Sequence, residues 1–103
     1  MMLLTKALRR KLPGLYAQEG LGGDAIAHVK FFTPDSNWTW YAIEFDGEDT
    51  FFGLVDGYYK EFGYFSFSEL KTVRGKLGLP VERDLHWKPT TLREIAPGLF
   101  GVK

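Results

Sequence analysis

The chain of 103 residues has the length of one domain with one hydrophobic core, so we expect a single domain over residues 1–103. Its 13 basic and 13 acidic side chains leave no net charge, which favours neither nucleic acid nor a membrane surface as a target. The absence of cysteine excludes disulfides, thiolate catalysis and cysteine-based zinc sites, and it fits a reducing, cytoplasmic setting. No stretch has the length and apolarity of a signal peptide or a membrane span, and no pattern requires a cofactor.

A short helix is predicted over residues 6–12, because Thr5 is a suitable N-cap and Pro13-Gly14 is a stop signal. Leucines at four-residue spacing form one apolar stripe: Leu4, Leu8 and Leu12. The basic residues beside it are interpreted as a solvated helix face, with a phosphate contact as the alternative: Lys6, Arg9, Arg10 and Lys11. The glycine-rich residues 20–24 are expected to form a linker.

The middle of the chain, residues 27–67, contains most of the aromatic residues and predicts consecutive antiparallel strands. One strand covers residues 25–32 and is followed by a turn over residues 33–37. Two further strands flank the turn that begins at Asp46-Gly47, where the acidic tip is either solvated or faces a basic partner. We therefore expect an α+β fold with a small antiparallel sheet of three to five strands, a hairpin meander, and helices packed on one face.

Alternation along these strands predicts two unequal faces of the sheet. The core face is expected to carry Ala27, Val29, Phe31, Tyr41, Ile43, Phe45, Phe52 and Leu54. The second face is expected to carry His28, Lys30, Phe32, Trp38, Trp40, Glu44, Phe51, Gly53 and Val55. Either other elements of the chain cover its rings, or it is a binding surface with Trp38 and Trp40 as anchors. Gly53 indicates that a ring or another backbone lies close to it, so Trp40 is expected to lie over Gly53 or beside Val55.

The last third of the chain predicts two capped helices around an edge strand. The pattern from Ser66 to Glu69 is a capping box and predicts a helix over residues 67–74 that ends at Gly75, with its apolar stripe on the core face. Before it, the strand that follows Asp49 is expected to continue to residue 59 and to turn at residues 61–63, rather than at Asp56-Gly57. Residues 81–87 predict a half-buried or an edge strand, and Thr91 caps one short helical turn.

Two groupings have residue types that catalyse reactions. Asp84 and His86, with Glu82 on the same side of one strand, resemble a metal or acid–base pair, and His28 with Glu44 resembles a proton-transfer pair. An exposed polar strand and a structural hydrogen bond are the simpler interpretations. Since no nucleophile elbow, zinc-protease helix or phosphate loop is present, we assign no catalytic residue and no metal ligand.

Seven segments resemble a family of short bacterial proteins known as domain of unknown function 2958. They are residues 3–5, 28–34, 37–41 (Asn-Trp-Thr-Trp-Tyr), 44–47, 52–55, 63–66 and 82–86. The resemblance covers nearly the whole chain and implies a setting on plasmids, integrative elements and phages, without an assigned activity or catalytic residues. Small proteins in that setting often act by binding, for example by blocking a host defence component.

We therefore expect a non-enzymatic binding protein whose aromatic sheet face contacts a protein partner. The expected binding residues are Lys30, Phe32, Trp38, Trp40, Phe51, His28 and Glu44. The alternatives are a nucleic-acid or nucleotide binder, in which these rings stack on bases and Lys30, Arg9 and Arg10 contact phosphates, and an enzyme that uses His28 or Asp84 and His86. The sequence does not predict an oligomeric state.

Overall fold

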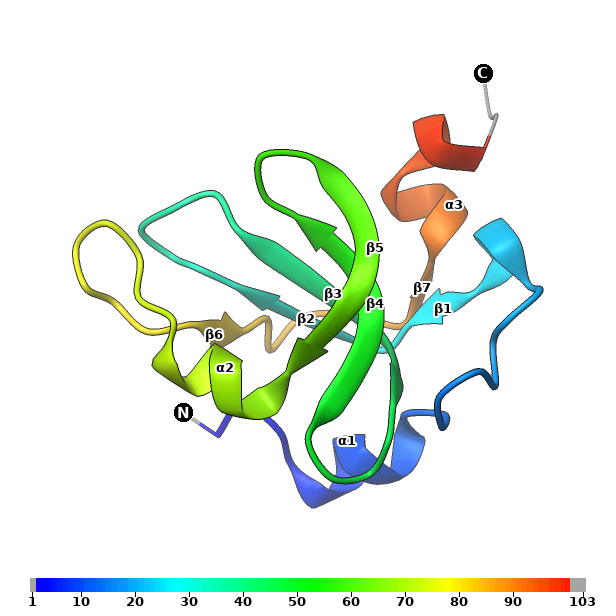
Figure 1. Ribbon diagram of the computed structural model, residues 1–103, viewed down its shortest axis with the longest axis horizontal. Coiled ribbons are helices and arrows are strands. Elements are labelled where there is room, and N and C mark those ends of the chain that lie inside the picture. Colours follow the sequence, from blue (N-terminus) through cyan, green and yellow to red (C-terminus); the bar gives the residue numbers. More distant parts are fainter. Residues whose placement is uncertain (1, 101–103) are drawn as a thin grey trace.

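A five-stranded antiparallel sheet is the main feature of the computed structural model, which describes residues 2–100 (Figure 1). The strands lie in the order β5-β4-β3-β2-β6, and a separate pair joins β1 to β7. Their bounds are β1 (Ile26–Ala27), β2 (Val29–Phe32), β3 (Thr39–Phe45), β4 (Thr50–Asp56), β5 (Lys60–Ser66), β6 (Glu82–Arg83) and β7 (Thr90–Thr91). The predicted α+β fold class, with a small antiparallel meander, is confirmed.

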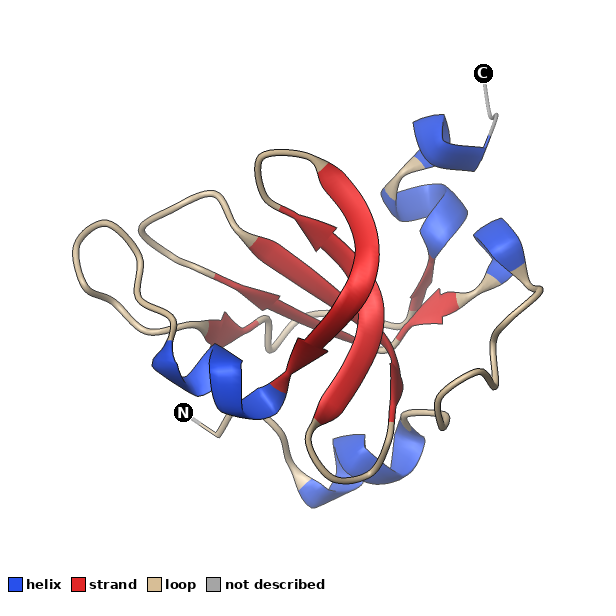
Figure 2. Cartoon of the chain, viewed as in Figure 1, coloured by secondary structure: helices blue, strands red, loops and turns tan. Residues whose placement is uncertain are grey.

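Short helices lie around the margins of this sheet, as Figure 2 shows in blue. They are α1 (Lys6–Lys11), α2 (Phe67–Thr72), α3 (Leu92–Ile95) and two 3-10 turns, η1 (Gly22–Asp24) and η2 (Pro97–Phe100). The three predicted N-caps are confirmed, because the hydroxyls of Thr5, Ser66 and Thr91 accept backbone N–H groups at 3.1, 3.0 and 3.4 Å. Local capping chemistry therefore fixes where each α-helix begins.

The connection between β2 and β3 is one residue longer than predicted. Trp38 belongs to the loop, where its N–H donates to the Thr33 hydroxyl and its carbonyl accepts from the Thr33 N–H, both at 3.0 Å. As a result Phe32 pairs with Thr39, and Phe31 pairs with Trp40. Since one residue of register exchanges the faces, Lys30 pairs with Tyr41, and the predicted grouping of Val29 and Phe31 with Tyr41 is wrong.

A β-bulge in β3 is the second departure from the predicted faces. The register with β4 shifts between Ala42 and Glu44, so that Glu44 pairs with Phe52 and Phe45 pairs with Phe51. The extra residue turns Phe45 to the side of Trp40, while Tyr41 and Leu54 stay paired on the opposite side. Trp40 and Tyr41 do lie on opposite faces, as predicted, but the odd-numbered residues from 27 to 45 do not share one face.

The two faces that result have different covers. The first face packs against leucines of the N-terminal segment, α1 and α2, and its buried residues are Val29, Phe31, Trp40, Ala42, Phe45, Phe51 and Phe65. Leu70 of α2 is buried in this cluster with Phe67 and Val73 against it, which confirms the predicted packing stripe of that helix. The second face carries Tyr41, Ile43 and Leu54, which pack against Leu92 and Ala96 near α3.

Three further predictions of where strands begin and end are wrong. The strand after Asp49 turns at residues 57–59, not at 61–63, and Gly57 leaves room for the ring of Trp38. The expected strand over residues 25–32 is split at His28, so that β1 and β2 join different sheets. Residues 81–87 form only the two-residue strand β6; it lies at the edge of the sheet, as one of the two alternatives predicted, but Leu85 is exposed.

Helix α2 also ends earlier than predicted, at Thr72, and Gly75 has another role. The Asp35 carboxylate accepts the N–H groups of Leu77 and Leu79 at 2.7 and 3.1 Å, and it lies so close to Gly75 that a Cβ there would overlap it. The loop between α2 and β6 therefore depends on one side chain of the β2–β3 loop.

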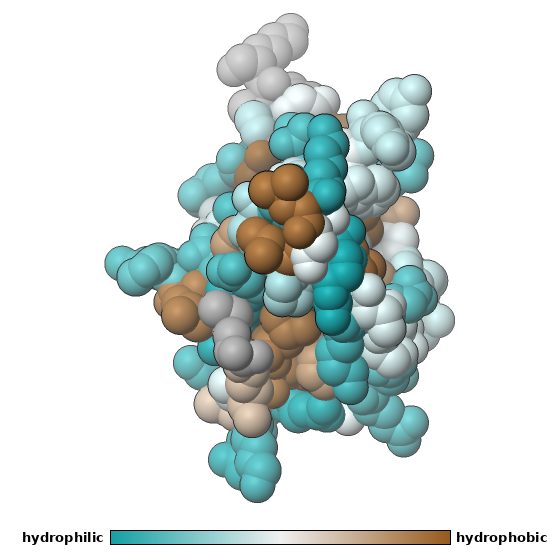
Figure 3. All heavy atoms as spheres, turned by 90° about the vertical axis from the view of Figure 1, so that its left-hand side faces the viewer, coloured by the Kyte–Doolittle hydropathy of each residue, from teal (hydrophilic) through white to brown (hydrophobic). Residues whose placement is uncertain are grey.

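That loop lies on the side of the molecule that Figure 3 presents, where apolar surface, in brown, stands among hydrophilic side chains. Leu77 and Leu79 of the loop are 81% and 45% exposed.

The hairpin between β3 and β4 contains the acidic tip. There the Asp46 carboxylate accepts the N–H groups of residues 48, 49 and 50, and these hydrogen bonds lower the pKa of Asp46. The acidic tip thus organises its own turn.

Candidate aromatic pocket

A pocket of about 320 Å³ opens on the second face of the sheet, between the loop before β1, the β4–β5 hairpin and the C-terminal turns. Five of the residues that line it carry rings: Tyr16, Phe52, Phe62, Tyr64 and Phe100. The ring of Phe52 lies 5.2 Å from Tyr64 and 6.3 Å from Phe62, measured between centroids, and Phe62 lies 6.2 Å from Phe100. Glu44 also lines the pocket, although it is only 4% exposed.

Glu44 reaches this place because of the bulge in β3. The extra residue there puts Ile43 and Glu44 side by side in the pocket lining. The Glu44 carboxylate accepts the N–H of Tyr16 at 2.9 Å with one oxygen and the N–H of Gln18 at 2.7 Å with the other. A strand of the sheet therefore holds a loop that lies more than twenty residues before it in the sequence.

Gln18 fixes the same loop from the other direction. Its amide nitrogen donates to the carbonyls of Ile26 and Ile43 at 2.9 and 3.0 Å, and its amide oxygen accepts the N–H of Ile26 at 2.7 Å. Tyr16, which lies two residues before Gln18 in the same loop, has a φ of 71°, a left-handed conformation that is uncommon for a residue other than glycine. Such conformations persist where the surroundings impose them and are frequent at ligand sites.

The phenols of Tyr16 and Tyr64 connect the loop to the β4–β5 hairpin. A hydrogen bond with Tyr16 is the main reason why the pKa of Tyr64 is raised above its usual value, and partial burial adds to the shift. Both residues are nevertheless well exposed, at 65% for Tyr16 and 57% for Tyr64. The pocket therefore has a rim of polar-tipped rings and a buried carboxylate, an arrangement suited to binding.

The predicted binding residues are not brought together at one place. Trp40 and Phe51 are 7% and 0% exposed in the first-face core, so their predicted exposure is wrong and they are not available to stack on bases. Trp38 stacks on Trp40 with centroids 6.0 Å apart. Internal elements cover these rings, which was the other interpretation of the tryptophan face. Of the seven predicted residues, only Glu44 lines the aromatic pocket.

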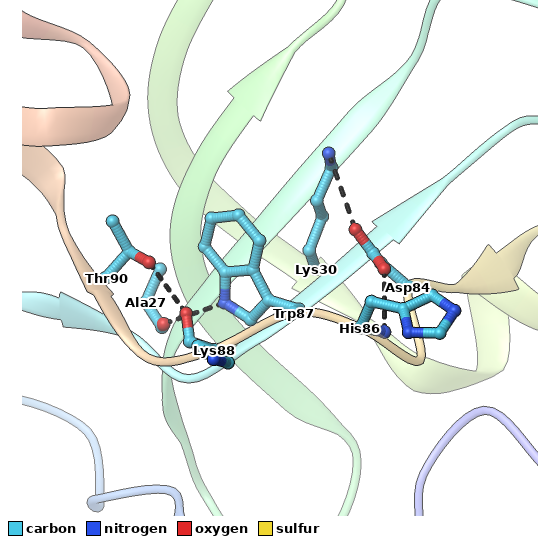
Figure 4. Close-up of polar contacts among 7 residues, drawn as sticks. All are labelled: Ala27, Lys30, Asp84, His86, Trp87, Lys88 and Thr90. Carbon is cyan, nitrogen blue, oxygen red and sulfur yellow. Dashed lines mark hydrogen bonds and ion pairs between the residues drawn. The ribbon is translucent and has the colours of Figure 1, made fainter.

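Lys30, Phe32 and Trp38 line a separate, more open recess of about 450 Å³. Figure 4 shows how Lys30 is engaged there: its ammonium group lies 3.8 Å from the Asp84 carboxylate and 5.5 Å from the centroid of the Trp87 ring. The Trp87 indole N–H in turn donates to the Ala27 carbonyl at 3.0 Å. These contacts attach the segment after β6 to the second face of the sheet.

The two groupings that resembled catalytic pairs have structural contacts instead. The backbone N–H of His86 donates to the Asp84 carboxylate at 2.9 Å, and the same carboxylate pairs with Lys30. Within residues 2–100, no three His, Asp or Glu side chains gather in a group that could hold a metal ion. His28 lines a recess beside Trp87, whereas Glu44 lines the aromatic pocket, so the predicted contact between these two side chains is not formed.

Burial, assisted by the nearby positive charge of Lys11, lowers the pKa of His28 from its usual 6.5. The unfolded chain therefore binds a proton at this site more readily than the folded protein does. We expect the free energy of unfolding to fall as the pH is lowered from above to below 6.5, and this part of the loss to be absent in His28→Gln. Urea denaturation across that pH range measures it, and an equal loss in both proteins would contradict the assignment.

Sequence reasoning missed most of the pocket. The alternation of Phe62 and Tyr64 around Gly63 was an available signal, and it depended on choosing the hairpin at Asp56-Gly57. Nothing local marks Tyr16 or Gln18, which reach the site through long-range contacts with β3. Phe100 likewise joins the pocket from the end of the described chain.

These features define a small α+β protein in which helices bury one face of an antiparallel sheet and the other face carries an aromatic pocket. The chain belongs to the family described as "Protein of unknown function (DUF2958)", whose model matches residues 3–95. Comparison with curated proteins gave no match, and comparison with solved structures gave none either. None of the helices among residues 2–100 is long and apolar enough to cross a membrane.

Proposed function

We propose that the protein is a non-enzymatic binding module that accepts a side chain of a protein partner in the aromatic pocket. The observation that carries this proposal is the ring-lined pocket itself, with its buried carboxylate. At about 320 Å³ it is at the lower end of the range of roughly 300–1,000 Å³ for ligand sites, a size suited to one side chain. Tyrosine and phenylalanine are also enriched where proteins bind one another.

The pocket is preformed, which favours binding over a purely structural role. Glu44 and Gln18 hold the loop that carries Tyr16 through five hydrogen bonds of 3.0 Å or less. A site whose walls are already ordered loses little conformational entropy when a partner binds. Phe62, at 45% exposure, presents ring surface that a partner would cover.

The proposed setting is the bacterial cytoplasm, where the protein would serve a plasmid, integrative element or phage by binding a partner such as a host defence component. A chain without cysteine suits a reducing interior. The family resemblance supports this setting by analogy.

Affinity capture from host cells tests the proposal with Phe62→Ala as the variant and Tyr59→Ala as its control. Tyr59 is 78% exposed on the same hairpin and does not line the pocket. We expect wild type and Tyr59→Ala to retain the same partner, and Phe62→Ala to bind it at least about tenfold more weakly, because anchor residues contribute most of the binding energy. Equal retention by all three proteins would refute the proposed site. Circular dichroism confirms that the variants are folded.

A further inference from the structure

We infer that the ligand of the aromatic pocket is an organic cation, the guanidinium group of an arginine side chain on the partner, with Glu44 as its counter-ion. The inference rests on the proposed function, since it names what enters that site. It follows from three features: a buried carboxylate that forms no ion pair with the described residues, aromatic rings beside it, and a lining in which none of residues 2–100 contributes a positive charge.

The Glu44 carboxylate is buried, and no cation of the described part of the chain pairs with it. One oxygen accepts the backbone N–H of Tyr16, and the other accepts that of Gln18. Among residues 2–100, no lysine or arginine forms an ion pair with the Glu44 carboxylate. A carboxylate has about four acceptor positions, so each oxygen can still accept another hydrogen bond. Burial of an unpaired charge is unfavourable, and a cation in the pocket would remove that cost.

The rings around Glu44 suit the same ligand. The faces of aromatic rings attract cations, and a guanidinium group is planar and weakly hydrated, so it stacks on rings more readily than an ammonium group does. A continuous wall of such rings runs along two neighbouring strands, where Phe52 contacts both Phe62 and Tyr64. A guanidinium between this wall and Glu44 would combine stacking with a charge-assisted hydrogen bond.

The charge of the lining has one sign. Glu19 is a second acid in the pocket, and none of the lining residues is basic. Arg93 of the neighbouring helix α3 is paired with Asp24 instead. Two carboxylates in a pocket to which no basic residue among 2–100 contributes repel phosphates and other anions and attract cations. A purely apolar side chain would fill the volume but would leave the charge of Glu44 without a counter-ion and further from water.

Titration with two small probes tests the inference directly. N-acetyl-arginine amide carries the guanidinium group, and N-acetyl-citrulline amide has the same length and a planar urea group without charge. In ¹H–¹⁵N NMR spectra of the wild-type protein, we expect the arginine probe to bind at least about tenfold more tightly than the citrulline probe. The amide signals of Tyr16 and Gln18, which donate to Glu44, should shift most.

Variants separate the role of charge from that of the rings. Glu44→Gln should abolish the preference for arginine, but that change can also disturb the loop. Glu19→Gln, at an exposed position of the lining, is therefore the second variant, and it should reduce the preference for arginine without unfolding the protein. Phe62→Ala should weaken both probes. Equal binding of the two probes, or binding of neither, would overturn the inference. Equally tight binding of citrulline and arginine would contradict only this inference and would leave the proposed function intact. A preference for arginine, together with normal capture of the partner by Phe62→Ala, would contradict the proposed function alone.

Discussion

Replacing Gly53 with alanine is expected to lower the free energy of unfolding by about 3 kcal/mol or more, the upper end of the range for overpacked interiors. A Cβ atom at this position would lie 1.9 Å from the carbonyl oxygen of Tyr41 and 3.3 Å from the Cα of Ala42. Both are backbone atoms of the adjacent strand β3, next to the bulge, so no side chain can rotate away. Relief of the overlap requires β3 and β4 to separate at the centre of the sheet.

Gly63 supplies a matched control, because it pairs directly with Gly53 across the β4–β5 ladder. A Cβ atom at Gly63 would meet no heavy atom within 4 Å, so Gly63→Ala should be neutral or should stabilise the protein by about 0.4–1 kcal/mol through the unfolded chain. Urea denaturation measures both variants. Equal midpoints for the two substitutions would show that the approach of β3 to Gly53 is not as close as described.

Gly53 also shows what the sequence could and could not predict. A glycine inside a strand correctly indicated a close neighbour, which is the backbone carbonyl of Tyr41. Of the two predicted places for Trp40, the one beside Val55 is confirmed and the one over Gly53 is not. The bulge next to this contact, between Ala42 and Glu44, is not indicated by any residue type at Ile43 or Glu44. Because each face depends on a strict two-residue period, this extra residue was enough to put Glu44 and Phe45 on the wrong faces.

Features set by neighbouring residues were predicted more reliably than features set by distant ones. The caps at Thr5, Ser66 and Thr91 depend on hydrogen bonds over three residues, and all three were located correctly. The loop before β3 depends on Trp38, whose ring is fixed by Trp40 and by the open space at Gly57. The pocket is the extreme case, since Tyr16 and Glu44 meet across 28 positions of the chain.

Phe51 and Phe52 are adjacent in β4 and face opposite sides of the sheet, so they give the clearest contrast between stability and binding. Phe51 is fully buried, and its ring lies 4.5 Å from Phe45, 5.2 Å from Phe65 and 5.6 Å from Phe31. Phe51→Ala should lower the free energy of unfolding by about 3–5 kcal/mol, since it leaves a cavity between three rings in the centre of the core. Thermal and urea denaturation measure this loss.

Phe52→Ala should reduce stability by less than half as much, because Phe52 is only partly buried and packs against exposed rings of the pocket. Its larger effect should fall on binding: without the Phe52 ring, the wall of the pocket is interrupted beside Glu44, and the arginine probe should bind more weakly. Phe51→Ala, measured where it remains folded, should keep its affinity for the probe. If Phe52→Ala were the more destabilised protein, or if only Phe51→Ala lost binding, the two faces of the sheet would have the opposite roles.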